Sequence, residues 1–116
     1  MQMRIEKLED IQVWQKARSA CVLIYSTFKE SRDFKFRDQI QSAAVSVMNN
    51  IAEGYERKGV KELERFLYIA KGSAGEVRSM LYLALDLKYI SNEESTKTSS
   101  MFTEISKMLA GFIRTL

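Results

Sequence analysis

The chain has 116 residues, no proline, five glycines and one cysteine, and 46% of its residues are hydrophobic. These totals predict one globular domain built from long helices, and they argue against a disordered chain, a β-sandwich or a disulfide framework. The net charge of +3 permits contact with nucleic acid without requiring it. The absence of histidine removes the commonest general base and transition-metal ligand.

The amino-terminal part of the chain reads as a short arm followed by a first helix. Apolar residues recur at three- and four-residue steps after the arm of residues 1–9, and they predict a helix over residues 10–29. Asp10 is the expected N-cap of this helix. Trp14 lies on the apolar stripe, so we interpret it as a core or interface anchor rather than a functional aromatic residue.

Two further helices follow, over residues 34–55 and 60–88, separated by a charged turn at Arg57–Gly59. Asp33 is the expected N-cap of the first of them. The helix over 60–88 carries apolar residues beyond a single stripe, which predicts a second neighbour, such as another subunit. These additional residues are Leu67, Tyr68, Ile69, Tyr82, Leu83 and Leu85.

A fourth helix is predicted over residues 92–114, because Ser91 and Glu94 form a capping-box pattern at its start. Four helices with short connections predict an all-α fold, an antiparallel up-down-up-down four-helix bundle in a single domain of residues 1–116. The first and third connections then share one end of the bundle, and the second connection shares the other end with both termini. No segment resembles a signal peptide or a membrane span, and the lone cysteine suits a reducing compartment, so we expect a cytoplasmic protein.

Small residues flank the charged turn and predict a close-packed seam between the second and third helices. Counting outward from the turn places Ala44 opposite Gly72 and Ala43 opposite Ser73. Small residues at such positions let two backbones approach closely, which would explain glycines inside a helix. The alternative, a phosphate-binding loop at residues 72–75, lacks both the lysine that grips phosphate and a preceding strand.

Polar residues near the seam raise the possibility of a metal site. Glu53 and Glu76 lie on or beside the apolar stripes, but carboxylate metal sites in bundles pair glutamate with histidine, which this chain lacks. We therefore expect no metal and no cofactor. Both glutamates are predicted to be partly buried and to accept hydrogen bonds, and Asn50 to meet a polar partner across the seam.

Three motifs in order and at characteristic spacing carry a family resemblance. They are Leu8-x-Asp10-Ile11-x-Val13-Trp14-Gln15-Lys16-Ala17; Gln39 with Ala43-Ala44-x-Ser46-Val47 and Asn50-Ile51-Ala52-Glu53-Gly54; and Ile69-Ala70-x-Gly72-Ser73-x-x-Glu76. Over nearly its whole length the chain resembles the bacterial four-helix-bundle proteins of the 23S rRNA intervening-sequence family, whose relatives include accessory proteins of diversity-generating retroelements. Two positions depart from the family pattern. The first turn has no proline, and Gln41 and Ser42 stand where basic residues are usual.

The resemblance implies a fold, an assembly and a set of partners. It implies a four-helix bundle that forms a ring-shaped homopentamer, with structural roles for the motif residues Asn50, Glu53, Gly54, Gly72, Ser73 and Glu76. The retroelement relatives look like nucleic-acid binders that also contact a reverse transcriptase. For most members of the family no biochemical role is settled.

Three classes of function compete. The first is a non-catalytic oligomer that binds RNA or DNA through a basic cluster at the second turn, Arg57, Lys58, Lys61 and Arg65, with Arg4, Lys7 and Arg114 expected at the same end. The second is a protein-interaction module, such as an accessory subunit of a reverse transcriptase or an RNA-processing protein. The third, an enzyme, is disfavoured because no histidine activates the hydroxyl groups and Cys21 lies on an apolar stripe.

Overall fold

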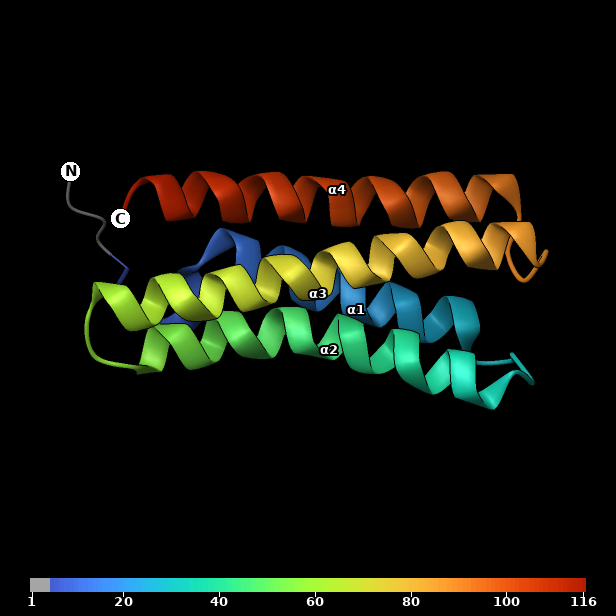
Figure 1. The fold of residues 1–116 in the computed structure, drawn as a ribbon, viewed down its shortest axis with the longest axis horizontal. Helices are drawn as coiled ribbons and strands as arrows, with labels where there is room; N and C mark the ends of the chain where they lie inside the picture. Colours follow the sequence, from blue (N-terminus) through green and yellow to red (C-terminus); the bar gives the residue numbers. More distant parts are fainter. Residues whose placement is uncertain (1–4) are drawn as a thin grey trace.

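A computed structural model describes residues 5–116 as four long helices preceded by one short 3₁₀ helix (Figure 1). The 3₁₀ helix η1 spans Leu8–Asp10, and the four α-helices are α1 (Gln12–Phe28), α2 (Phe34–Glu56), α3 (Val60–Asp86) and α4 (Asn92–Arg114). Residues 5–116 contain no strand. The all-α prediction is therefore confirmed, whereas residues 1–4 of the predicted arm lie outside the described part of the chain.

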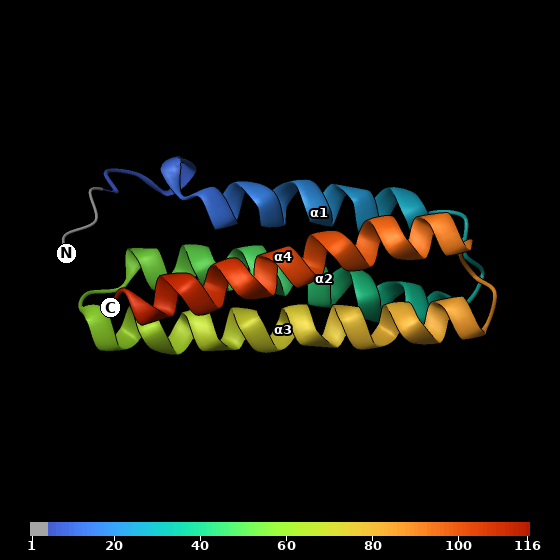
Figure 2. The ribbon, with the colours of Figure 1, turned by 90° about the horizontal axis from the view of Figure 1, so that it is seen from above.

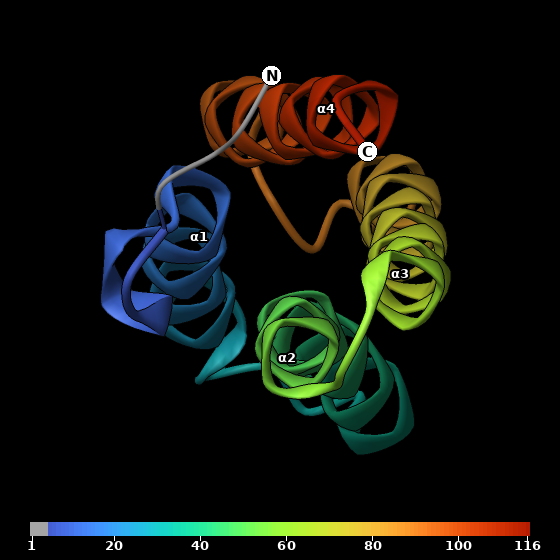
Figure 3. The ribbon, with the colours of Figure 1, turned by 90° about the vertical axis from the view of Figure 1, so that its left-hand side faces the viewer.

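The helices form an antiparallel bundle in which sequence neighbours are also neighbours in space. The packed pairs are α1–α2, α2–α3, α3–α4 and α1–α4. Viewed end-on, α1 and α3 occupy opposite corners (Figure 3). Figures 1 and 2 show the α1–α2 and α3–α4 connections at one end, and the α2–α3 connection with the C-terminus at the other. A 2.7 Å hydrogen bond from the Tyr89 hydroxyl to Asp33 Oδ2 ties the two connections of the first end together.

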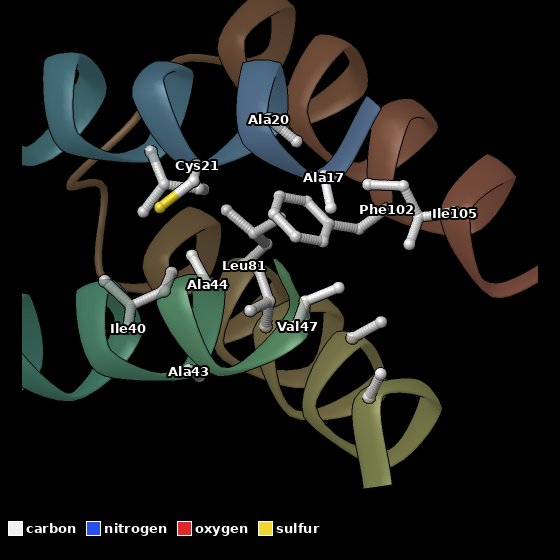
Figure 4. Close-up of a cluster of buried hydrophobic side chains, with 14 of the residues drawn as sticks. Ala17, Ala20, Cys21, Ile40, Ala43, Ala44, Val47, Leu81, Phe102 and Ile105 are labelled. Atoms are coloured by element: carbon white, nitrogen blue, oxygen red, sulfur yellow. The ribbon is translucent and has the colours of Figure 1, made fainter. Parts of the chain in front are cut away.

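The core lies along the axis between the four helices. Figure 4 shows the Phe102 ring reaching from α4 towards Ala17 of α1, with Leu81 of α3 and Val47 of α2 close by. None of these four side chains has any exposed surface. Buried alanines on the other three helices leave room for such large side chains: Ala17, Ala20, Ala43, Ala44, Ala70, Ala74 and Ala84. Since burying one large apolar side chain contributes about 1.5–3 kcal/mol, this interior is the main source of stability.

Two of the three predicted N-caps are confirmed. The Phe36 N–H donates to Asp33 Oδ1 at the start of α2, and Ser91 and Glu94 form both hydrogen bonds of a capping box at the start of α4. The prediction for Asp10 is wrong, since Ile11 occupies the N-cap position of α1 without a side-chain hydrogen bond. Asp10 is instead the last residue of η1, so α1 begins two residues later than predicted.

The end of α3 also differs from the prediction. The helix ends at Asp86, two residues early, because Lys88 adopts a left-handed conformation with φ of 61°. The Tyr89 N–H donates to the Ala84 carbonyl and the Lys88 N–H to the Leu85 carbonyl, which is the Schellman pattern of helix termination. Lysine rather than glycine occupies the left-handed position, so the usual sequence signal for this ending is missing.

The seam between α2 and α3 has a different register from the predicted one. Ser73 shares a 2.8 Å hydrogen bond with Ser46, about one helical turn from the expected partner Ala43. Successive helix residues are about 100° apart, so when Ser73 faces α2 its neighbour Gly72 faces outward. A methyl group added at Gly72 or Gly75 would meet no atom within 4 Å. The prediction that these two glycines bring α2 and α3 together is therefore wrong.

The close approach of the two helices occurs at Gly54 instead. This glycine is buried, and a Cβ atom there would lie 2.9 Å from Phe66 Cβ and 3.2 Å from Leu63 Cδ1. Both contacts are with α3, at its first turns after the connection. The one glycine that α2 contributes to the family motif is thus the one that steric contact requires.

Candidate interaction surfaces

The predicted basic cluster at the α2–α3 turn is built around the ring of Phe66. The Arg57 Nε donates to Glu53 Oε2 at 2.9 Å, and the Arg65 Nε donates to Glu62 Oε2 at 3.0 Å. Both guanidinium groups also lie over the Phe66 ring, with centroid distances of 5.2 Å for Arg57 and 4.4 Å for Arg65. The Arg65 hydrogen bond holds the pKa of Glu62 below its usual range, so this carboxylate is charged at neutral pH.

These contacts compensate much of the positive charge at the turn. Residues 53–65 carry four basic and four acidic side chains, and Arg57 also approaches Glu62 Oε1 at 3.7 Å. Lys58 and Lys61 are exposed, and neither forms an ion pair with another residue of the described chain.

Other basic residues extend this end of the molecule. Lys7 and Arg114 are exposed and belong to segments at the same end, whereas Arg4 lies outside the described residues. The structure therefore brings all four predicted cluster residues together, but leaves two lysines as its uncompensated cations.

The motif residues of the hairpin separate into a partly buried polar group and two exposed acids. The Asn50 Nδ2 donates to the Ser46 carbonyl and to Ser46 Oγ, which lie on the same helix, so the prediction that Asn50 meets a partner across the seam is wrong. The polar contact that does cross the seam joins Ser46 Oγ to Ser73 Oγ. Glu53 and Glu76 are both exposed, and the prediction that they are partly buried is wrong.

The side of α3 that faces away from the bundle carries a continuous, mostly uncharged surface. We call this the α3 outer face, and it comprises Tyr68, Ile69, Gly72, Gly75, Ser79, Tyr82 and Leu83, with Glu76 and Asp86 among them and exposed Lys71 at its edge. Tyr82 is 69% exposed and Tyr68 is 56% exposed, although both are large aromatic side chains. The small residues between them leave the backbone of α3 open to a neighbour.

The outward side of α1 carries a second exposed surface, with a different charge. We call it the α1 outer face, and it comprises Gln15, Arg18, Ser19, Val22, Tyr25, Ser26 and Lys29, with Arg37 and Gln41 of α2 at its edge. Two shallow hollows run along it and meet at Val22. Val22 is 65% exposed. Arg37 is hydrogen-bonded to Asp38 at 3.3 Å, and α1 itself contains no acidic residue.

Sequence reasoning missed the α1 outer face, although the sequence carried a signal. Val22 and Tyr25 fall off the apolar stripe of the first helix, as Tyr82 and Leu83 do in the third. The segment from Gln12 to Phe28 contains basic residues and no carboxylate, which indicates a helix surface with only positive charge. Trp14, by contrast, is half-buried against the core, with the Arg18 guanidinium 5.8 Å from its ring centroid.

The remaining groups that could carry chemistry are dispersed or shielded. Cys21 is buried, and burial raises the pKa of its thiol, which disfavours the reactive thiolate. Within residues 5–116, no three acidic or cysteine side chains gather as a metal-binding group. None of the described helices is both long enough and apolar enough to cross a membrane.

Comparisons with known proteins agree with the fold. The family model described as "23S rRNA-intervening sequence protein" matches residues 9–111. A crystal structure of a protein with unknown function from the S23 ribosomal protein family of Bacteroides thetaiotaomicron superimposes with a TM-score of 0.82. The two chains are 28% identical, and the match covers 87% of this chain and 97% of that one. A search of curated proteins gave no match.

The sequence motifs, the helical arrangement and the family match over most of the chain point to one conclusion. The chain belongs to the 23S rRNA-intervening sequence protein family.

Proposed function

We propose that this protein is a non-catalytic scaffold that assembles into a homo-oligomer through the α3 outer face. The observation that carries the proposal is the exposure of Tyr68, Ile69, Tyr82 and Leu83 on one side of a single helix. Monomeric proteins rarely leave large apolar side chains gathered on one surface, because covering them is favourable. The resemblance to the family supports a ring-shaped homopentamer as the assembled form.

Two glycines of the α3 outer face favour a helical neighbour. Gly72 and Gly75 each lower helix stability by up to about 1 kcal/mol relative to alanine. No contact within the chain requires them, since the space above both is open. A second helix packed across these positions would approach the α3 backbone closely, which is the usual reason for small residues at a helix crossing.

The α3 outer face is tested by placing a charge within it. Leu83→Arg should lower the molar mass measured by sedimentation velocity towards the 13.4 kDa of one chain, because an arginine cannot be buried there without a partner. Leu116→Arg, at an exposed apolar residue beside the C-terminus, should leave the mass unchanged. An unchanged mass for Leu83→Arg would contradict the use of this face.

A second proposed function is RNA or DNA binding at the α2–α3 turn. Exposed Lys58 and Lys61, with Arg57 and Arg65 held on Phe66, offer several phosphate-binding side chains within two helical turns. A ring would present several copies of this turn, so avidity could strengthen a weak local contact. The compensating carboxylates of Glu53 and Glu62 make this candidate weaker than self-assembly.

A salt titration of binding to a single-stranded RNA tests the second function. Each phosphate contact contributes a slope of about −0.7 in the logarithm of the binding constant against the logarithm of the salt concentration. Lys58→Ala with Lys61→Ala should make the slope shallower by about 1.4. Lys97→Ala with Lys107→Ala, on α4, is the matched control. Absence of binding by the wild-type protein at low salt would exclude this function.

A protein of another kind is the alternative occupant of the exposed faces. The relatives associated with retroelements suggest a reverse transcriptase or an RNA-processing protein, for which this chain would be an accessory subunit in the cytoplasm. The large exposed tyrosines of the α3 outer face suit such a partner, because tyrosine is enriched at protein interfaces.

A further inference from the structure

We propose that the α3 outer face of one copy docks on the α1 outer face of the next copy, so that the assembly is held by two different surfaces. This inference rests on the self-assembly proposed above and adds the identity of the partner surface. The alternative, in which two α3 outer faces meet each other, would give a symmetric pair and leave the α1 outer face uncovered.

The positions of the two faces in the bundle suit a contact that repeats from one copy to the next. α1 and α3 lie at opposite corners of the end-on view (Figure 3) and are not a packed pair. A copy can therefore offer its α1 side to one neighbour and its α3 side to another at the same time. Contacts between two different surfaces generate closed rings when the rotation between copies closes.

The charged side chains within the two faces differ in sign, although Lys71 borders the α3 outer face and Asp38 pairs with Arg37 at the edge of the α1 outer face. The acidic residues of the α3 outer face are Glu76 and Asp86, both exposed. The α1 outer face offers exposed Arg18 and Lys29 and no carboxylate from α1 itself. Opposite charge on facing surfaces steers two copies together and disfavours α3 against α3, where like charges would meet.

The opposite charges also lie at matching heights along the bundle. Heights on α1 and α3 are compared through α2, because Ser46 of α2 is bonded to Ser73 of α3 and the Phe36 ring of α2 lies 5.6 Å from the Phe28 ring of α1. On this comparison Arg18 lies within about one helical turn, ~5 Å, of Glu76 in height, and Lys29 lies within about one turn of Asp86. In a ring whose rotation axis is parallel to the helices, neighbouring copies are not shifted along the helices, so both pairs can form together.

The shapes of the two faces fit the same arrangement. By the same comparison, exposed Val22 lies at a height between those of Gly75 and Ser79, two small residues. Val22 is also where the two hollows of the α1 outer face meet. An apolar side chain that projects from α1 therefore faces the part of α3 whose backbone is most open.

Charge reversal followed by charge restoration tests the pairing. One variant combines Arg18→Glu with Lys29→Glu, and a second combines Glu76→Lys with Asp86→Lys. In sedimentation velocity, each should raise the concentration of half-assembly at least tenfold, because like charges then face each other. A chain with all four substitutions should assemble as the wild type does, because both pairs are restored with reversed sign. Lys97→Glu with Lys107→Glu, which makes the same change of charge on α4, should have no effect.

The outcomes separate this pairing from the proposed function. If the α1 variant assembles normally while Leu83→Arg does not, the α3 outer face is an interface but its partner is not α1, and the pairing is wrong. If the α1 variant assembles normally and instead loses binding to RNA, the α1 outer face belongs to nucleic acid, which also overturns it. A wild-type protein that stays monomeric would remove both proposals. Circular dichroism of each variant confirms that the helices are intact.

Discussion

At the scale of single residues, Gly54 shows most directly how sequence and packing are connected. Its missing side chain lets α2 meet Phe66 and Leu63 of α3 just beside the turn. A second glycine, Gly111 in α4, has only an ordinary contact of 3.7 Å from its added Cβ to Arg114. The two positions look alike in the sequence, since both are helical glycines, but their surroundings differ.

Alanine substitutions at the two glycines should change stability in opposite directions. Gly54→Ala should lower the free energy of unfolding by about 1–3 kcal/mol, because a Cβ 2.9 Å from Phe66 Cβ forces the helices apart. Gly111→Ala should raise it by up to about 1 kcal/mol through helix propensity. Urea unfolding of both variants measures the difference, and a Gly54→Ala protein as stable as the wild type would contradict the close approach.

The hydrogen bond between Tyr89 and Asp33 makes one contribution to stability depend on pH. The bonds from the Tyr89 hydroxyl and the Phe36 N–H hold the pKa of Asp33 below its usual range. Because the folded pKa is lower than the unfolded value of about 3.9, this contribution is complete above that value and is lost as the pH falls through the folded pKa. The same bond raises the pKa of Tyr89, so the contribution is complete below about 10 and is lost as the pH rises through the folded pKa.

Thermal unfolding of Tyr89→Phe between pH 7 and pH 2 tests this bond. The variant should have a lower midpoint than the wild type at neutral pH, and the difference should shrink below about pH 4 as Asp33 is protonated. Tyr55→Phe, which removes a hydroxyl at the opposite end of the bundle, should show no such dependence. A difference between Tyr89→Phe and wild type that persists unchanged at pH 2 would show that the bond is not responsible.

At the scale of helices, the sequence predicted the existence and order of all four, because each carries a regular apolar stripe. The start of α4 was predicted correctly from Ser91 and Glu94, whose hydrogen bonds are local. The errors at the start of α1 and the end of α3 arise because these two helix ends lack the usual capping residues. A 3₁₀ helix precedes α1, and lysine takes the left-handed position usually held by glycine after α3.

Lys88→Gly should therefore stabilise the protein. Glycine adopts a positive φ without the steric cost that lysine has, so the free energy of unfolding should rise by about 1 kcal/mol. Lys107→Gly, within α4, should lower it by a similar amount. Chemical unfolding of the two variants compares them, and a loss of stability in Lys88→Gly would mean that the chain does not end α3 in this way.

The seam between α2 and α3 marks the limit of what counting residues could predict. The hairpin itself followed from the two stripes and the charged turn. Its register did not, because residues 57–59 leave the helical path and the rotation of α3 after them depends on packing. With Ser73 turned towards α2, Gly72 and Gly75 face outward and become candidates for an intermolecular contact.

At the scale of the whole molecule, the bundle has a closed core and two exposed faces on opposite sides. The four residues of the predicted basic cluster do lie together at the α2–α3 turn, but the two arginines are paired with Glu53 and Glu62. The sequence could not show this compensation, because the pairs depend on how the turn folds over Phe66. The exposed apolar surface of α3, by contrast, was predicted in part. Tyr68, Ile69, Tyr82 and Leu83 are exposed as expected, whereas Leu67 is buried in the core.

The mass of the unmodified protein in solution is the most direct test of self-assembly. Native mass spectrometry at micromolar concentration should give a whole-number multiple of 13.4 kDa, with five copies expected from the family resemblance. Another multiple would retain self-assembly and reject the pentamer. A single species of 13.4 kDa would contradict the central claim that the α3 outer face is covered by a second copy of this chain.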